Sequence, residues 1–217
     1  AFLAVACRHM GAEPEPWEGM HARAAAAFER FWNAGTGHAF DVIDGPEGDD
    51  PALRPNQLLA ARAATGAFDA ARRRAIVDVC ARHLLTPAGL RSLAPGDPAY
   101  RPRYGGDQTA RDAAYHQGTV WAWLIGPFVE AHLDAYGDPG RAAALLAPLA
   151  DQLAIEAVGT VGEIFEGAAP HRPAGCVAQA WSVGEMLRAW RLIETARSGT
   201  PASPPAPPPA AIPAADA

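Results

Sequence analysis

Glu163 is an acidic residue in a setting that a carboxylate seldom occupies without a purpose. It stands between Gly162 and Ile164 in the string GEIFEG, residues 162–167. A charged group among small and apolar neighbours costs free energy unless it has partners or a function. Such a carboxylate can accept a proton from water and act as a general base in glycoside hydrolysis. The alternative is a surface glutamate or a partner of a helix N-terminus.

A second string, RDAAYHQGTVWAW at residues 111–123, combines a cation, a carboxylate, an amide and several aromatic rings. Proteins recognise sugars with such mixtures, because planar polar groups match vicinal hydroxyls and aromatic faces match the C–H side of the ring. The alternative is a buried Arg–Asp pair with two core tryptophans beside a helix start. Trp181 follows in the string AQAWS, residues 178–182.

A third string, RPNQ at residues 54–57, stands where a loop passes into a helix. Pro55 suits the first turn of a helix, and Arg54 and Asn56 are then placed to face a ligand. Simple helix capping is the alternative. In the preceding loop, Asp41 and Asp44 are candidates for pairing with an arginine or for touching substrate.

The elements that must position these strings are mainly helical. Apolar residues at three- and four-residue spacing predict helices over 2–10, 16–32, 56–65, 68–84, 118–136, 139–156 and 178–197. Long loops rich in Gly, Pro and Asp are predicted over 33–55, 86–117 and 159–177, with a short strand at 39–43. An all-α scaffold with functional loops gathered at one end is the simplest architecture. The Pro- and Ala-rich tail, residues 198–217, is predicted to be disordered.

Composition excludes several classes of function. The 217 residues carry a formal net charge of −6 and no lysine, so a nucleic-acid partner is not expected. Cys7, Cys80 and Cys176 are too far apart for a metal-binding pattern, and no phosphate-binding glycine motif occurs. No apolar run reaches the ~20 residues that span a bilayer. A cytoplasmic protein without metal, cofactor or membrane partner is expected.

Together these strings resemble those of one enzyme family. RPNQ (54–57), LLTPAGLRSLAPGDPAY (84–100), RDAAYHQGTVWAW (111–123) and GEIFEG…PHRPAGCVAQAWS (162–182) are similar to strings of bacterial and archaeal glycogen debranching enzymes. They occur in the family's order, across roughly residues 20–195, in the C-terminal amylo-α-1,6-glucosidase domain. Four strings in register are far more specific than any one of them.

The resemblance implies a fold, a reaction and a site. The fold is an all-α (α/α)6 toroid related to glucoamylase, of which residues 1–197 form the C-terminal part. The reaction is inverting hydrolysis that releases glucose from α-1,6 branch points of glycogen or a related α-glucan, with Glu163 as the base. The residues implied to line the terminal glucose subsite are Arg54, Asn56, Gln57, Asp112, Tyr115, His116, Gln117, Trp121 and Trp181.

The chain departs from the family pattern at two points. Ala122 stands where the family commonly has proline, and the tryptophan-methionine-aspartate string that carries the general acid upstream of RPNQ does not occur. The chain is therefore expected to be a fragment that is inactive alone. The alternatives are a non-catalytic α-glucan-binding or scaffold module, and a related toroid hydrolase acting on trehalose or an α-1,4 glucan.

Overall fold

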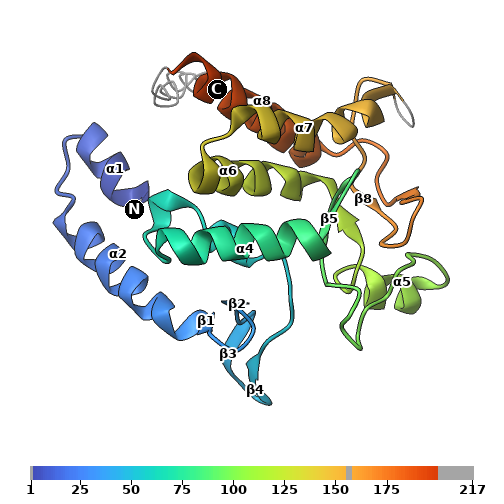
Figure 1. The fold of residues 1–217 in the computed structure, drawn as a ribbon, viewed down its shortest axis with the longest axis horizontal. Coiled ribbons are helices and arrows are strands. Elements are labelled where there is room, and N and C mark those ends of the chain that lie inside the picture. Colours follow the sequence, from blue (N-terminus) through green and yellow to red (C-terminus); the bar gives the residue numbers. More distant parts are fainter. Residues whose placement is uncertain (1, 155–157, 200–217) are drawn as a thin grey trace, which may run out of the picture.

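The computed structural model describes residues 2–154 and 158–199, and helices dominate it (Figure 1). The α-helices are α1 (Phe2–His9), α2 (Glu15–Ala27), α3 (Gln57–Ala60), α4 (Ala70–His83), α5 (Gln108–Ala114), α6 (Ile125–Tyr136), α7 (Pro139–Ala150) and α8 (Ala180–Ser198). Four 3-10 turns are η1 (Phe28–Phe31), η2 (Ala63–Thr65), η3 (Ala122–Leu124) and η4 (Asp151–Ala154). The strands are β1 (Trp32–Asn33), β2 (His38–Ala39), β3 (Val42–Gly45), β4 (Gly48–Asp50), β5 (Leu85–Thr86), β6 (Gly89–Arg91), β7 (Val120–Trp121), β8 (Ile164–Phe165) and β9 (Pro173–Ala174).

Helix α6 is the centre of the helical layer. It packs against α4 on one side and against α7 and α8 on the other (Figure 1). Phe128 and Val129 on α6 are fully buried, as expected for a helix that is covered on several faces. At Gly126 an added Cβ would overlap the Glu185 carboxylate of α8, so glycine permits the close approach of these helices. The core therefore runs along α6.

Aspartate caps set where three of the helices begin. The side chains of Asp69, Asp107 and Asp138 accept hydrogen bonds from backbone N–H groups in the first turns of α4, α5 and α7. Such a cap satisfies one of the N–H groups that a helix start leaves unpaired, and contributes about 1 kcal/mol. Helix α6 ends at Gly137, whose left-handed backbone has φ of 62°. Local sequence thus determines the ends of the helices.

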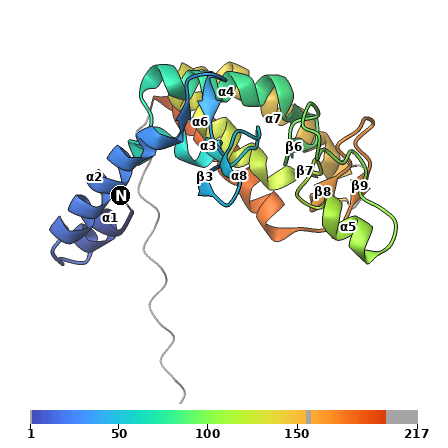
Figure 2. The same ribbon diagram turned by 90° about the horizontal axis from the view of Figure 1, so that it is seen from below.

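A five-stranded antiparallel sheet, in the order β5-β6-β7-β8-β9, lies at one end of the helical layer beside α5 (Figure 2). Leu90 on β6 pairs with Trp121 on β7, and Trp121 pairs in turn with Ile164 on β8. Gly89 has φ of +132°, and an added Cβ there would overlap the Trp121 backbone. The sheet joins three loops that are far apart in the sequence.

Most of the predicted helices are confirmed, and the start of one is wrong. The prediction over 118–136 fails at its beginning, because Gly118 has φ of +129° and Val120–Trp121 is a strand, so α6 begins at Ile125. The strand predicted over 39–43 is divided between β2 and β3, and the loop predicted over 86–117 holds β6 and α5. The predicted helix end at 155–156 and the tail from residue 200 lie outside the described residues.

Helices α1 and α2 form a hairpin that projects from the helical layer (Figures 1 and 2). Phe2, Met10 and Met20 on or next to this hairpin are 78%, 74% and 53% exposed. Within the described residues nothing covers these side chains. None of the described helices is both long enough and apolar enough to cross a bilayer.

The half-buried carboxylate of Glu130 on α6 offers a test of the packing. Its oxygens lie 2.9 Å from Nη2 of Arg62 and 2.7 Å from Nη1 of Arg188 on α8, and its side chain is 17% exposed. Glu130→Gln removes the counter-charge of Arg62 and leaves Arg188 paired with Glu185 alone, and we expect the free energy of unfolding to fall by roughly 1–3 kcal/mol.

Glu194→Gln is the matched control, because it removes an exposed i,i+3 pair with Arg197 on α8. We expect the control to change the free energy of unfolding by less than about 0.5 kcal/mol. Urea unfolding measures both variants. Equal losses would contradict a structural role for the Glu130 network.

Candidate active site

A hollow of about 410 Å³ lies where three distant parts of the chain meet. The loop around β4 and α3, the turn before β7, and the start of α8 each contribute to its wall. The lining residues are Asp41, Asp50, Arg54, Pro55, Asn56, Ser92, His116, Gln117, Trp121, Trp123, Leu124 and Trp181. The structure thus brings together, from the subsite predicted from sequence, Arg54, Asn56, His116, Gln117, Trp121 and Trp181.

Arg54 holds three segments of this wall together. Its Nη1 donates to the carbonyl oxygens of Ser92 at 3.1 Å and of His116 at 2.7 Å. Its Nη2 donates to Oε1 of Gln117 at 2.7 Å, and its Nε lies 3.4 Å from Oδ2 of Asp41. A guanidinium presents five N–H donors in a fixed fork, and most of these are used within the protein. Arg54 therefore organises the hollow as well as lining it.

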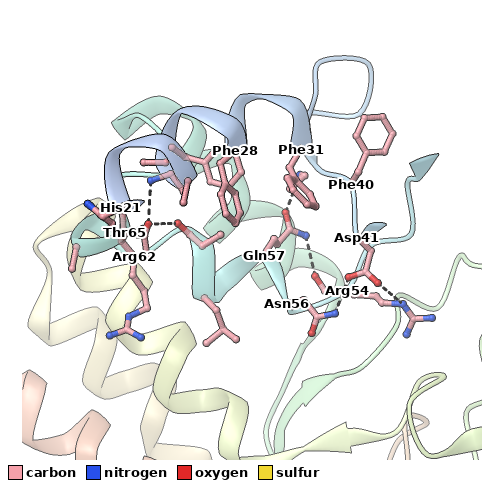
Figure 3. Close-up of a pocket in the computed structure, with 18 of the residues that line it drawn as sticks. His21, Phe28, Phe31, Phe40, Asp41, Arg54, Asn56, Gln57, Arg62 and Thr65 are labelled. Atoms are coloured by element: carbon pink, nitrogen blue, oxygen red, sulfur yellow. Dashed lines mark hydrogen bonds and ion pairs between the residues drawn. The ribbon is translucent and has the colours of Figure 1, made fainter. Parts of the chain in front are cut away.

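The next two polar residues of the RPNQ string have different surroundings (Figure 3). Nδ2 of Asn56 donates to Oδ1 of Asp41 at 2.7 Å, which leaves the amide oxygen of Asn56 as an acceptor at the hollow. Gln57 is buried, accepts from the N–H of Ala39 at 3.2 Å and donates to the carbonyl of Arg54 at 3.0 Å. Asn56 lines the hollow, whereas Gln57 ties two backbone segments together outside it.

Figure 3 shows a second hollow, which has a volume of about 770 Å³. Its wall is mainly phenylalanine and alanine, and the aromatic residues are Phe2, Phe28, Phe31, Phe40 and Phe68. It shares Asp41, Arg54 and Asn56 with the first hollow. The larger hollow also has polar lining residues of its own, His21, Gln57, Arg62 and Thr65, so Gln57 lines this hollow and not the smaller one.

Stacked rings form the remaining wall of the smaller hollow. The His116 and Trp121 rings are parallel within 1° at 5.1 Å, and the Trp123 and Trp181 rings stack at 5.2 Å. Trp121 meets Trp181 edge to face at 5.7 Å. Trp181 stays 46% exposed in spite of these contacts. This arrangement offers aromatic surface to the C–H side of a sugar ring.

Glu163 lines neither hollow; three donors hold its carboxylate, and one of them, Tyr115, packs its ring against His116 and Trp121 of the smaller hollow's wall. The hydroxyl of Tyr115 donates to Oε1 at 2.6 Å, and Nε2 of Gln179 lies 3.4 Å from the same oxygen. The backbone N–H of Cys176 donates to Oε2 at 3.0 Å. We call Tyr115, Cys176 and Gln179 the Glu163 cradle. Within the described residues, the hydrogen-bond partners of the carboxylate are all donors, and both of its oxygens accept.

Two groups at the site have shifted pKa values. Burial, and then the hydrogen bond to Glu163, raise the pKa of Tyr115 well above its usual range, so the phenol remains a donor. Burial, and then the positive charge of Arg54, lower the pKa of His116. His116 is thus neutral at pH 7, with one ring nitrogen able to accept and the other to donate.

Sequence reasoning and structure differ over several side chains. Asp112 is exposed on α5 and lines neither hollow. Asp41 and Asp44 do pair with arginines, Asp44 with Arg30 at 2.7 Å. Residues that were not singled out also contribute, namely Asp50, Ser92, Trp123, Cys176 and Gln179. Ser92, Trp123, Cys176 and Gln179 stand within the strings already noted, whereas no local pattern distinguishes Asp50.

Gly175 allows a test of the cradle. Its φ is +70°, and an added Cβ would lie 2.5 Å from Oε2 of Glu163 and 2.8 Å from Cγ1 of Ile164. Gly137, with φ of +62° and open space around it, is a matched control. We expect Gly137→Ala to cost roughly 1 kcal/mol of unfolding free energy, and Gly175→Ala to cost clearly more. Thermal unfolding measures both, and equal costs would contradict close packing at the carboxylate.

Comparison with known proteins gives three findings. A model of the amylo-alpha-1,6-glucosidase family matches residues 2–188. The glycogen debranching enzyme of Saccharomyces cerevisiae is 35% identical over 89 residues, which are 38% of this chain and 6% of the yeast protein. A GH63 mannosylglycerate hydrolase from Thermus thermophilus, solved in complex with glucose, superposes with a TM-score of 0.65. That match has 20% identity and covers 87% of this chain and 44% of the other.

The neutral trehalase of Saccharomyces cerevisiae superposes with a TM-score of 0.57 at 12% identity, over 85% of this chain and 33% of that one. The chain thus spans less than half the length of these relatives. These likenesses confirm the predicted fold class, the all-α (α/α)6 toroid. By the match over residues 2–188, the chain belongs to the amylo-α-1,6-glucosidase family.

Proposed function

We propose that this chain is part of an inverting glycoside hydrolase that releases glucose from α-1,6 branch points of glycogen or a related α-glucan. The observation that carries the proposal is the Glu163 carboxylate, held by three donors, one of which is the Tyr115 hydroxyl whose ring packs on the wall of a hollow of aromatic and amide groups. Family membership and the partial likeness to the yeast glycogen debranching enzyme support the choice of substrate.

In the proposed reaction Glu163 is the general base. It takes a proton from water while that water attacks the anomeric carbon, and the bond from that carbon to the glycosidic oxygen breaks. A second carboxylic acid protonates the departing oxygen, and inverting enzymes place the two groups about 6.5–9.5 Å apart. Asp41 is poorly suited to be this acid, because its oxygens already face Arg54 and Asn56. The tryptophan-methionine-aspartate string that carries the acid in the family does not occur in this chain, so we assign the acid to another part of the protein.

The hollow supplies contacts for an uncharged sugar ring. Trp123 and Trp181 offer aromatic surface, while Asn56, His116 and Gln117 supply acceptors and donors for hydroxyl groups. The amide of Gln117 has a determined orientation, because its oxygen accepts from Arg54 and its nitrogen is left to donate. The hollow can therefore hold a sugar through its hydroxyls and its C–H face together.

A related toroid hydrolase acting on another α-glucoside is the second candidate. The likeness in fold to a mannosylglycerate hydrolase and to a trehalase favours it. Glucose release by the complete protein from an α-1,6-branched limit dextrin, maltotriose and trehalose separates the two. Preference for the branched dextrin supports debranching, and preference for either other sugar supports the second candidate. Saturable dextrin binding without hydrolysis would instead indicate a binding module.

Glu163→Gln tests the assignment of the base. The amide retains the shape of the side chain but cannot accept the proton, so we expect kcat for glucose release to fall roughly 10²- to 10⁴-fold. Dextrin binding should change little, and the variant should still fold, although its amide nitrogen faces a donor of the cradle and lowers the unfolding temperature. Steady-state assays and equilibrium binding measure these quantities in the complete protein.

Glu166→Gln is the matched control, since Glu166 lies three residues further along the same loop and is also half-buried. Its activity should stay within about twofold of the unsubstituted protein, as for surface changes away from the chemistry. Near-normal turnover by the Glu163→Gln variant would exclude Glu163 as the base.

A further inference from the structure

Tyr115 follows the last residue of α5, and its hydroxyl contacts the Glu163 carboxylate. The ring packs against Trp121 at 4.7 Å, His116 at 4.9 Å and Tyr104 at 5.7 Å. Tyr115 does not line the hollow. Its hydroxyl lies 2.6 Å from Oε1 of Glu163. This side chain therefore belongs to the surroundings of the carboxylate.

The hydroxyl proton of Tyr115 already takes part in a hydrogen bond. A phenol has one O–H donor, and here that donor is used by Glu163. The raised pKa of Tyr115 keeps that proton in place through the neutral range. The three surrounding rings leave the side chain little freedom to turn toward a sugar. A role as a sugar donor would require this hydrogen bond to break.

The two oxygens of Glu163 are anchored from different segments. Tyr115 reaches Oε1 from the end of α5, and the N–H of Cys176 reaches Oε2 from the turn after β9. The last torsion of a glutamate side chain is soft and nearly two-fold. Donors on both oxygens remove that freedom, and the Gly175 backbone limits movement on one side.

We propose that Tyr115 is a positioning residue, which orients the Glu163 carboxylate toward the attacking water and does not bind the sugar. The inference rests on the proposed function, in which Glu163 is the base. Proton transfer needs the two groups within hydrogen-bond distance and aligned. A misplacement of about 1 Å is enough to cost roughly 100-fold in rate. Tyr115 therefore acts on the reaction through Glu163.

The experiment is Tyr115→Phe in the complete protein, which keeps the ring packing and removes only the hydroxyl. We expect kcat on limit dextrin to fall roughly 10- to 100-fold and KM to change less than about threefold. Tyr104→Phe is the matched control: it alters the ring that packs on Tyr115 and should leave kcat unchanged.

Two outcomes overturn the inference. An unchanged kcat in Tyr115→Phe would leave the residue with ring packing alone. A raised KM with unchanged kcat would make it a sugar ligand.

A double-mutant cycle in thermal unfolding separates this inference from the proposed function. Tyr115→Phe, Glu163→Ala and the double variant should be non-additive, because both single changes remove the same hydrogen bond. Additive effects would exclude the contact. A coupled cycle in a protein that hydrolyses no α-glucoside would overturn the proposed function, and would reduce the Tyr115–Glu163 bond to a structural role.

Discussion

The pairing of β7 with β8 is the constraint on which the site depends. Val120 lies opposite Phe165 and Trp121 opposite Ile164, so the segment that ends in Trp121 runs beside the segment that begins at Glu163. A slip of one residue would turn every side chain of a strand to the other face, and Glu163 would then leave Tyr115. Gly167 protects this register, because an added Cβ there would overlap the carbonyl oxygen of Gly118. Short strands can hold a register when backbone contacts of this kind leave no alternative.

The helical layer and the site impose different demands on the chain. Helix α6 gains its stability from burial on several faces, and its neighbours α4, α7 and α8 cover it. The site is built from loops at one end of that layer, where Arg54 joins three of them through backbone carbonyls and one amide. Rigid helices that carry functional loops are a common division of roles. The exposed apolar residues of the α1–α2 hairpin show that part of the described surface has no cover within these residues.

Sequence patterns predicted the helices better than the strands, for physical reasons. Helices such as α4 and α7 begin at aspartate caps and repeat apolar residues over several turns. A repeat of that length is enough to distinguish a helix from a strand in the sequence. Strands of two or three residues are too short to show alternation, so the start of the predicted helix over 118–136 was wrong.

The types of residue also predicted which segments of the chain line the hollow. Three strings of the sequence are rich in amide, imidazole and indole groups, and each of them contributes to the wall. The residue types did not predict how each group points: Gln57 turns to backbone, Asp112 to solvent, and the Tyr115 hydroxyl to Glu163.

In the proposed reaction, water that the Glu163 base activates attacks the sugar from the face opposite the departing oxygen. The configuration of the first product therefore tests whether the hydrolysis is a single displacement, as a general-base role for Glu163 requires. Proton NMR of glucose freshly released from limit dextrin by the complete protein distinguishes the two anomers before they interconvert. Single displacement on an α-linkage predicts β-D-glucose as the first product. Release of α-D-glucose first would require a retaining mechanism, and would contradict Glu163 as a general base in a single-step hydrolysis.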